Sequence, residues 1–405
     1  MTAPQSPQRP DDRPDDRLDD APDEHPLLGV EIERLRSLTC AKWNWHDRDV
    51  LPAWVADMDL PPVPAAVDAV RALVDRGDFG YNNAAECQLS AAWAAWQERH
   101  FAWKPDERCV RVFCDVMQGV ESTVWLHTEP GDGVVVFTPV YPPFLKTVAK
   151  AGRVVVDCPL DPDGWRLDPD RLSAVVDDRT RAVLLCNPHN PTGRAFSRDE
   201  LEAIARVAEE RDLLVISDEI WADLRHPGAT HIPMATVSDE VAARTMTITA
   251  ASKSFNLAGL RCAIAHNGHA GLRRKFAAVP SHVFGAVGSP GAEASLAAWT
   301  SGEPWLDSTR AHLTEQRDHL ARRLAAEAPA VRFDVPEATY LAWLDLRQTA
   351  LGPDPAATLL ESARVALSSG LDFGPEGTGF ARLNFATTQT ILDAILDRIL
   401  PLLRT

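Results

Sequence analysis

A lysine between two serines is the residue of this chain with the clearest potential for chemistry. Lys253 stands between Ser252 and Ser254, directly after the strand-like run 245–249, and Arg261 follows eight residues later. A lysine held in packed, partly apolar surroundings loses its proton more easily and can form a Schiff base. A hydroxyl and a fixed cation are groups that bind phosphate. The segment therefore indicates a reactive amine beside a phosphate site.

Two further polar clusters strengthen this interpretation, because a lysine between serines is by itself usually a solvated surface residue. The motif Asn-Pro-His-Asn-Pro-Thr-Gly at 187–193 follows the apolar run 182–186, and Asp218 follows the run 213–216. Both clusters thus lie at the carboxyl ends of buried-type strands, where open α/β sheets place their ligand sites. In isolation the first would be a simple turn and Asp218 a helix cap. An aspartate here can keep a pyridine nitrogen protonated, so together the clusters indicate pyridoxal 5′-phosphate (PLP).

In this order, the three clusters resemble those of the fold-type I PLP enzymes, the class I and II aminotransferase superfamily. The resemblance covers nearly the whole chain after about residue 27. Further motifs are similar to those of the cystathionine β-lyases of the MalY and PatB type. These motifs are Lys-Trp at 42–43, Leu-Pro-Ala-Trp-Val-Ala-Asp-Met-Asp at 51–59, Phe-Gly-Tyr at 79–81, Val-Tyr-Pro-Pro-Phe at 140–144, Gly-Glu-Pro-Trp-Leu-Asp at 302–307 and Thr-Tyr-Leu-Ala-Trp-Leu-Asp at 339–345.

The resemblance implies roles for the residues around this cofactor. Lys253 would hold the aldehyde and then remove the substrate Cα proton, while Asp218 would bind the ring nitrogen. Asn190 would donate to the ring oxygen, and Tyr141 would stack on the ring, although a core tyrosine is the alternative. The expected catalytic residues are Lys253, Tyr141 and Asp218. The expected cofactor-binding residues are Gly119, Val120, Tyr141, Asn190, Asp218, Trp221, Ser252, Lys253, Arg261 and Tyr81.

Two anionic groups need binding sites. Gln118, Gly119 and Val120 precede a helix-like segment, so backbone amides at a helix N-terminus would meet the phosphate. The substrate carboxylate calls for a bidentate arginine, and Arg382 fits the family position for it. An arginine in a strand is otherwise usually an edge or surface residue. The expected substrate-binding residues are Arg382, Asp57 and Met58.

Two aromatic residues bear on assembly and specificity. Tyr81 resembles the tyrosine that reaches the phosphate of the neighbouring subunit, which implies a homodimer with shared active sites. Trp221 departs from the family pattern, in which Tyr or His commonly stands three residues after the ring aspartate. Because the indole only donates and is bulkier, the pocket near the ring oxygen should differ in shape.

Composition and charge narrow the class of protein. The chain has 405 residues, 45% of them hydrophobic, and a formal net charge of −17, which disfavours nucleic acid and anionic membranes as partners. Residues 1–26 are rich in Asp, Pro and Arg and are expected to be a disordered acidic tail. They have no signal-like apolar region, and no run long enough to span a membrane exists. Seven scattered cysteines without zinc spacing indicate a reducing cytoplasm and no metal.

The fold class is expected to be α/β, as in fold-type I PLP-transferases. Strand signals alternate with helix signals in the middle of the chain, which predicts a large domain with a mainly parallel central sheet and helices on both faces. A smaller α+β domain should accompany it. We expect residues 27–75 to join the small domain, residues 76–291 to form the PLP-binding domain and residues 292–405 to form the C-terminal small domain.

The predicted function is that of a PLP-dependent carbon–sulfur β-lyase, which would cleave L-cystathionine or another L-cysteine S-conjugate to a thiol, pyruvate and ammonia. A PLP-dependent aminotransferase is the main alternative, because it shares the same motifs. Trp221 leaves open a specialised lyase or decarboxylating enzyme of sulfur natural-product synthesis. A regulator on this fold is a further class, but the acidic residues 1–26 are too short to supply a DNA-binding domain.

Overall fold

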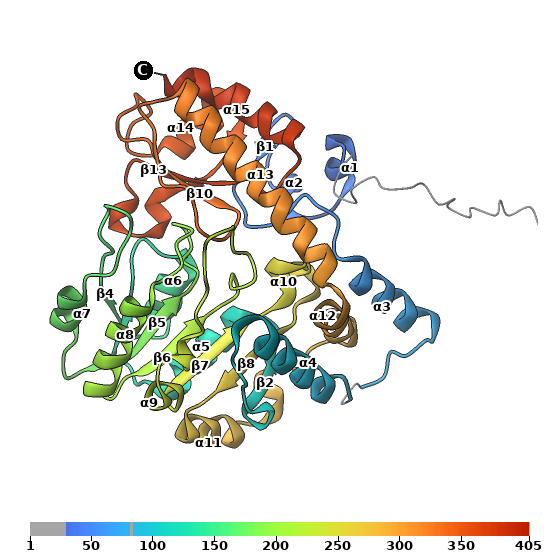
Figure 1. Cartoon of the computed structure of the whole chain (residues 1–405), viewed down its shortest axis with the longest axis vertical. Helices are drawn as coiled ribbons and strands as arrows, with labels where there is room; N and C mark the ends of the chain where they lie inside the picture. Colours follow the sequence, from blue (N-terminus) through green and yellow to red (C-terminus); the bar gives the residue numbers. More distant parts are fainter. Residues whose placement is uncertain (1–29, 82–83, 405) are drawn as a thin grey trace, which may run out of the picture.

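A large, mainly parallel sheet forms the centre of the molecule (Figure 1). The computed structural model describes residues 30–81 and 84–404, so the expected acidic tail lies outside the described residues. The described chain forms a seven-stranded sheet in the order β2-β8-β7-β6-β5-β3-β4. Its strands are β2 (Val110–Phe113), β3 (Gly133–Val136), β4 (Val154–Asp157), β5 (Thr180–Cys186), β6 (Leu214–Asp218), β7 (Thr245–Thr249) and β8 (Ala263–Asn267).

The direction of the strands brings the predicted polar clusters to one edge. Only β8 runs against its neighbours β7 and β2, and the other described neighbours are parallel. Cys186 pairs in register with Asp218, and Asp218 with Ile248, so β5, β6 and β7 end side by side. This arrangement confirms the predicted α/β class with a mainly parallel central sheet.

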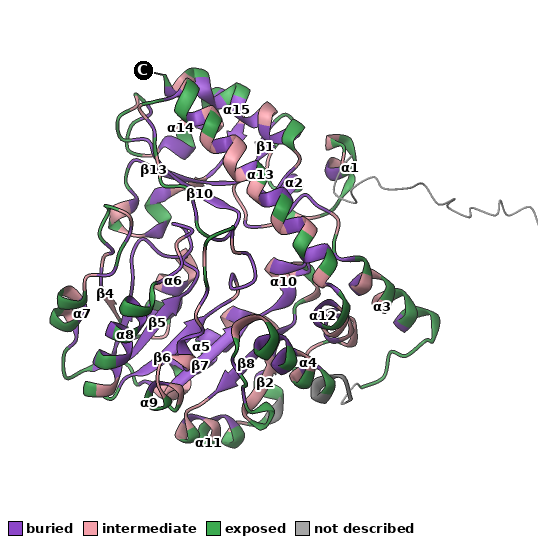
Figure 2. Ribbon diagram, in the orientation of Figure 1, coloured by how far each residue is buried: buried purple, intermediate pink, exposed green. Residues whose placement is uncertain are grey.

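The central strands of this sheet are buried, as Figure 2 shows, and apolar side chains cover both faces. One core cluster takes Leu184, Ile216 and Ile248 from three neighbouring strands together with Val120 of α5 (Val116–His127). The other takes Val183, Leu185 and Val215 from the opposite face together with Leu201 and Ile204 of α8 (Arg198–Glu210). Burying each large aliphatic side chain contributes about 1.5–3 kcal/mol. A sheet covered on both faces needs nearly continuous apolar strands, which is why the runs were visible in the sequence.

Helices pack around the large sheet and around the smaller sheets described below. The α-helices are α1 (Ile32–Ser37), α2 (Ala41–Asn44), α3 (Pro64–Asp75), α4 (Ala84–Phe101), α5 (Val116–His127), α6 (Pro142–Lys150), α7 (Pro169–Val175), α8 (Arg198–Glu210), α9 (Asp239–Ala242), α10 (Ala251–Ser254), α11 (Ala270–Ala278), α12 (Ser289–Ser301), α13 (Glu303–Glu327), α14 (Pro355–Ala363) and α15 (Gln389–Leu403). Short 3₁₀ turns are η1 (Glu107–Cys109), η2 (Met234–Thr236), η3 (Ala258–Leu260), η4 (Ser281–Val283), η5 (Gly370–Phe373) and η6 (Pro375–Gly377). Within the described ranges no helix is long and apolar enough to cross a membrane.

The start of the described chain joins its end. Strand β1 (Leu51–Pro52) pairs in parallel with β11 (Val365–Ala366). Beside this pair lies an antiparallel sheet in the order β12-β13-β10-β9, and α13, α14 and α15 lie in the same upper part of Figure 1. Its strands are β9 (Arg332–Phe333), β10 (Leu341–Asp345), β12 (Ser368–Ser369) and β13 (Phe380–Asn384). The domain boundaries expected at residues 76 and 292 stay predictions.

Candidate active site

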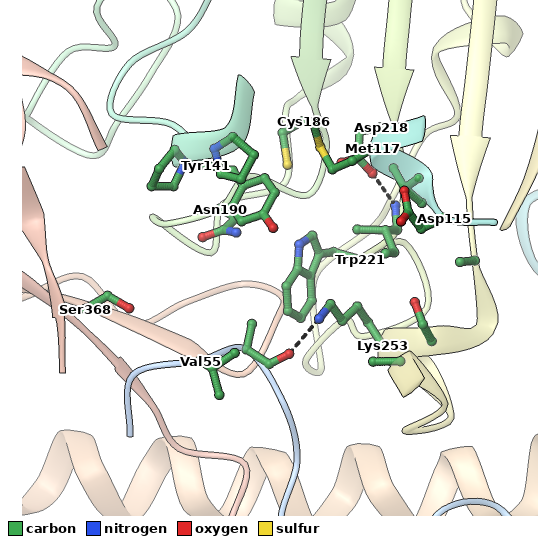
Figure 3. A pocket seen from close by; sticks show the side chains of 18 of the residues that line it. Val55, Asp115, Met117, Tyr141, Cys186, Asn190, Asp218, Trp221, Lys253 and Ser368 are labelled. Carbon is green, nitrogen blue, oxygen red and sulfur yellow. Dashed lines mark hydrogen bonds between the residues drawn. The ribbon is translucent and has the colours of Figure 1, made fainter. Parts of the chain in front are cut away.

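A cavity of about 430 Å³ lies between the carboxyl edge of the large sheet and the smaller sheet. Its walls come from segments far apart in the sequence (Figure 3). Eight of the predicted site residues line it, namely Tyr141, Asn190, Asp218, Trp221, Ser252, Lys253, Arg261 and Arg382. The polar clusters that follow β5, β6 and β7 therefore meet in one place, although they are dispersed over the sequence.

Lys253 lies in α10, a single helical turn that begins two residues after β7. Its Nζ donates to the Ala56 carbonyl oxygen at 2.6 Å and lies 5.9 Å from the centre of the Trp221 ring. Burial lowers the pKa of the Lys253 ammonium, and the Asp57 carboxylate opposes this effect. A lowered pKa makes the neutral amine more available, which both Schiff-base formation and proton abstraction require.

Asp218 ends β6, where it is 4% exposed. One carboxyl oxygen accepts from the Ile220 amide at 3.0 Å (Figure 3). Burial raises the pKa of Asp218 to about 7, and the neighbouring Glu219 charge adds to this rise. A buried carboxylate without a cationic partner is costly, so the site favours a positively charged group opposite Asp218.

The helix N-terminus at the cavity is not where we expected it. The expectation that Gly119 and Val120 precede the helix is wrong, because α5 begins at Val116. Asp115 caps it, and its Oδ1 accepts from the Gln118 amide at 2.7 Å.

Gly119 and Val120 occupy the second turn of α5, and neither lines the cavity. A Cβ added to Gly119 would lie 3.2 Å from two side-chain atoms of Ile248, so this glycine serves close packing of the helix on the sheet. Val116 and Met117 line the cavity instead. Amides in the first turn of a helix lack intrahelical partners, so the candidate anion site moves to these two residues.

Arg261 and Ser252 approach the same region from other segments. Arg261 follows η3 with a φ of +54°, and its guanidinium forms an ion pair with Asp115. Ser252 is half-buried in α10. A hydroxyl, a guanidinium and a helix N-terminus thus open onto one cavity, which is the donor set that binds a phosphate.

Arg382 is buried on β13 and connects both sheets. Its Nη1 donates to Asn190 Oδ1 at 2.8 Å, while Nη2 donates to the Trp54 carbonyl oxygen at 2.9 Å and to Ser368 Oγ at 3.1 Å. Its Nε is buried without a hydrogen-bond partner among the described residues. Burial lowers the pKa of Arg382 to about 10, so the group remains a cation at neutral pH and fits a carboxylate ligand.

Two aromatic residues shape the wall. Tyr141 immediately precedes α6, its ring centre lies 5.9 Å from that of Phe144, and burial raises the pKa of its hydroxyl. Trp221 is 2% exposed and packs edge-on against Tyr340, with ring centres 4.9 Å apart. Both rings therefore border the cavity from fixed positions.

Besides Gly119 and Val120, three predicted residues do not line this cavity. Asp57 and Met58 line a neighbouring one of about 260 Å³. The Asp57 carbonyl oxygen accepts from Lys42 Nζ and from Asn384 Nδ2. Tyr81 is fully exposed. Its proposed reach into a second subunit stays a prediction.

Sequence reasoning missed the main-chain contribution of the segment before Asp57. Trp54, Val55 and Ala56 line the cavity, and the Ala56 carbonyl oxygen accepts from both Lys253 Nζ and the Tyr340 hydroxyl. The motif at 51–59 did point to this segment. It could not reveal that the contacts run through carbonyl oxygens, because every residue type carries one.

Other missed residues belong to the small-sheet side. Ser368 binds Arg382, and Phe373 places its ring 5.0 Å from the guanidinium carbon. Asp372 also lines the cavity, as does Asp115 on the opposite, large-sheet side. The only available signal was the position of Asp115 one residue before an apolar turn, which is typical of a helix cap.

The residues present fit PLP. An amine of lowered pKa, a buried carboxyl group and a phosphate-type donor set line one cavity. The unpartnered Nε of Arg382 indicates that a further acceptor belongs there. No group of three His, Cys, Asp or Glu side chains suited to a metal ion occurs in residues 30–81 and 84–404.

Comparison with known proteins agrees with this geometry. The family model for aminotransferase class I and II matches residues 62–399. The chain is 39% identical to a putative cystathionine β-lyase of Mycobacterium leprae, over 93% of this chain and 97% of that protein. It is 35% identical to the cystathionine β-lyase PatB of Bacillus subtilis, over 87% and 92%.

A solved structure shows the same likeness in three dimensions. The crystal structure of a putative PLP-dependent β-cystathionase from Corynebacterium diphtheriae superimposes with a TM-score of 0.86 at 31% identity, and the match covers 93% of this chain and 98% of that one. The match spans both the large and the small sheet, since so little of either chain is left out. The chain belongs to the class I and II aminotransferase family, and within it to the branch of the PatB- and MalY-type cystathionine β-lyases.

Proposed function

We propose that this protein is a PLP-dependent carbon–sulfur β-lyase that acts on L-cystathionine or another L-cysteine S-conjugate. The observation that carries the proposal is Lys253, an amine of lowered pKa that faces a cavity shared with Asp218 and Arg382. The relatives that match over most of the chain are named cystathionine β-lyases, and this supports the substrate class.

Each residue has a distinct task in this proposal. Arg382 would bind the substrate α-carboxylate through its fork of donors, and Asn190, hydrogen-bonded to it, would fix its orientation. PLP, when bound, supplies an electron sink for the charge that develops at Cα. Asp218 would face the ring nitrogen, Tyr141 would cover the ring, and Lys253 Nζ would take the Cα proton.

The remaining residues would hold the phosphate and exclude water. The first-turn amides of α5, Ser252 and Arg261 form the donor set, and Trp221 closes the wall near Lys253. A Cα–H bond held close to Lys253 makes proton removal effectively intramolecular. Departure of the β-thiolate and hydrolysis then give a thiol, pyruvate and ammonia.

A homodimer with shared active sites and a cytoplasmic location belong to the same proposal. Tyr81 supports the dimer, because it is fully exposed beside the exposed Phe79, and large exposed aromatic side chains that lie together are typical of an interaction surface. An aminotransferase is the second candidate, since the matching family model carries that name. It would use the same residues up to proton removal and would need a 2-oxoacid to complete its cycle.

The test is release of pyruvate and free thiol from L-cystathionine and a panel of S-conjugates, with PLP-loaded protein and no 2-oxoacid. We expect Lys253→Ala to lower the rate by roughly 10²–10⁴-fold, because it removes the general base. Lys150→Ala changes an exposed lysine outside the cavity and serves as the control. Turnover only when a 2-oxoacid is added would establish the aminotransferase instead.

A further inference from the structure

One carboxylate at the cavity wall has no task in the proposed reaction. Asp372 lies in η5, is exposed, and lines the same cavity as Lys253 and Arg382. The two other carboxylates that line the cavity are engaged, since Asp115 pairs with Arg261 and Asp218 is buried. Within the described part of the chain, no hydrogen bond or ion pair involves the side chain of Asp372.

The backbone holds Asp372 in place on both sides. Phe373 is 1% exposed, and its carbonyl oxygen accepts from the Val140 amide at 2.8 Å. Gly370 packs so closely on Gly377 that an added Cβ would lie 2.1 Å from the Gly377 carbonyl oxygen. These contacts restrain the backbone that carries Asp372 at the cavity wall.

The surroundings of Asp372 determine which ligand arm would pair with it. Much of the wall is apolar or aromatic, including Trp54, Met117, Pro143, Ile220, Trp221 and Phe373. The lining cations have other roles in the proposed reaction: Lys253 would take the Cα proton, Arg382 would bind the α-carboxylate, and Arg261 pairs with Asp115. A cationic arm would thus meet an unpaired opposite charge, whereas an anionic arm would meet the like charge of Asp372.

We propose that Asp372 selects S-conjugates whose thiol arm carries a primary ammonium group. This inference rests on the proposed function, in which Arg382 would bind the α-carboxylate of the substrate. It adds how the protein recognises the thiol substituent that leaves. The methylene groups of such an arm pack on the aromatic wall, and its ammonium reaches the Asp372 carboxylate. Asp372 is thereby a specificity-determining residue.

Three conjugates of similar length test the proposal. They are S-(3-aminopropyl)-, S-butyl- and S-(3-carboxypropyl)-L-cysteine, which share a three-carbon arm and end in an ammonium, a methyl and a carboxylate group. We expect kcat/KM for thiol release to favour the aminopropyl over the butyl conjugate by roughly two- to fivefold, the range of an exposed ion pair. The carboxypropyl conjugate should be the poorest substrate.

Variants assign this preference to one residue. Asp372→Asn should bring the aminopropyl-to-butyl ratio close to one, and Asp372→Lys should favour the carboxypropyl conjugate. Asp178→Asn makes the same charge change at an exposed site outside the cavity and should leave the ratio as in the wild type. A wild-type ratio near one, or a ratio that Asp372→Asn does not change, would overturn the proposal.

A binding measurement separates this proposal from the proposed reaction. In PLP-loaded Lys253→Ala, which lacks the base, titration of the cofactor absorbance gives a dissociation constant for each conjugate. The constants should follow the same order, whichever reaction the wild-type protein catalyses. If the dissociation constants follow the expected order but the wild type releases no thiol, the proposed lyase reaction is overturned and the proposed role of Asp372 is supported. Equal dissociation constants would overturn the proposed role of Asp372.

Discussion

The two walls of the cavity are built from different parts of the polypeptide. The large-sheet wall offers side chains, such as Asp218 and Lys253, which follow the carboxyl ends of neighbouring strands. The opposite wall offers carbonyl oxygens, since Trp54 and Ala56 accept from Arg382 and Lys253. The first wall therefore determines the chemistry, and the second determines where the reactive cations point.

The largest expected effect concerns the buried carboxyl group of the large-sheet wall. The pKa of Asp218 is raised to about 7 in the folded protein, so the folded state holds this proton more tightly than the unfolded chain. The contribution of Asp218 to the stability of the folded state is therefore fully present below about pH 4 and is lost as the pH rises through 7. In cofactor-free protein, the stability of wild type relative to Asp218→Asn should fall by roughly 4 kcal/mol at most between these values.

Urea unfolding of both proteins across this pH range measures the effect. The buried histidines that titrate in the same range are present in both proteins, so their contribution to stability cancels in the difference. Asp177→Asn provides a control that should stay flat across this range. The Thr180 hydroxyl lowers the pKa of Asp177 below its usual value of 3.8, so its contribution is complete above about pH 4 and is lost only below it. A wild-type advantage that grows towards pH 7 would contradict the account of Asp218.

An intermediate effect is expected for the cation between the walls. Arg382→Lys keeps the charge, but one ammonium cannot reach Asn190, Trp54 and Ser368 together as the planar guanidinium does. We expect kcat/KM for cystathionine to fall about ten- to a hundredfold, the size of one or two charge-assisted hydrogen bonds. The loss should appear mainly in KM.

Arg181→Lys is the matched control, because Arg181 also lies on a strand but is exposed and outside the cavity. Steady-state kinetics of the three proteins decides the point. If Arg382→Lys behaved like the control, the planar guanidinium group would not be required at this position of the cavity.

The smallest effect is expected for the second donor to the Ala56 carbonyl oxygen. Tyr340→Phe removes a hydrogen bond of 3.0 Å but leaves Lys253 Nζ bound to the same oxygen. The free energy of unfolding should fall by about 0.5–1.5 kcal/mol, and the cofactor absorbance should change little. A large change of the absorbance instead would show that Tyr340 also governs the position of Lys253.

The sequence made the large-sheet wall predictable and left the other wall hidden. Runs such as 182–186 are apolar because both sheet faces are covered, and the polar motifs directly follow them. At the start of α8, Ser197 and Glu200 bind each other's backbone amides, and a serine followed three residues later by a glutamate is a pattern that indicates such a helix start.

The errors have physical causes. Gly119 was placed before the helix, yet it lies within α5, where Ile248 packs closely against it. Gly302 lies at the junction of α12 and α13, where a Cβ would clash with the Ala298 carbonyl oxygen and with Phe255. Contacts made by carbonyl oxygens leave no trace in residue type, so Trp54 and Ala56 could not be found from the sequence.

The pairing of β1 with β11 has a consequence for how the protein is made. The hydrogen bond from Arg382 to the Trp54 carbonyl oxygen joins residues 328 positions apart. While the chain is still being translated, Leu51 and Trp54 have emerged from the ribosome long before their partners on β11 and β13. The large sheet can begin to assemble on the nascent chain, but the closed pocket cannot exist until synthesis is nearly complete.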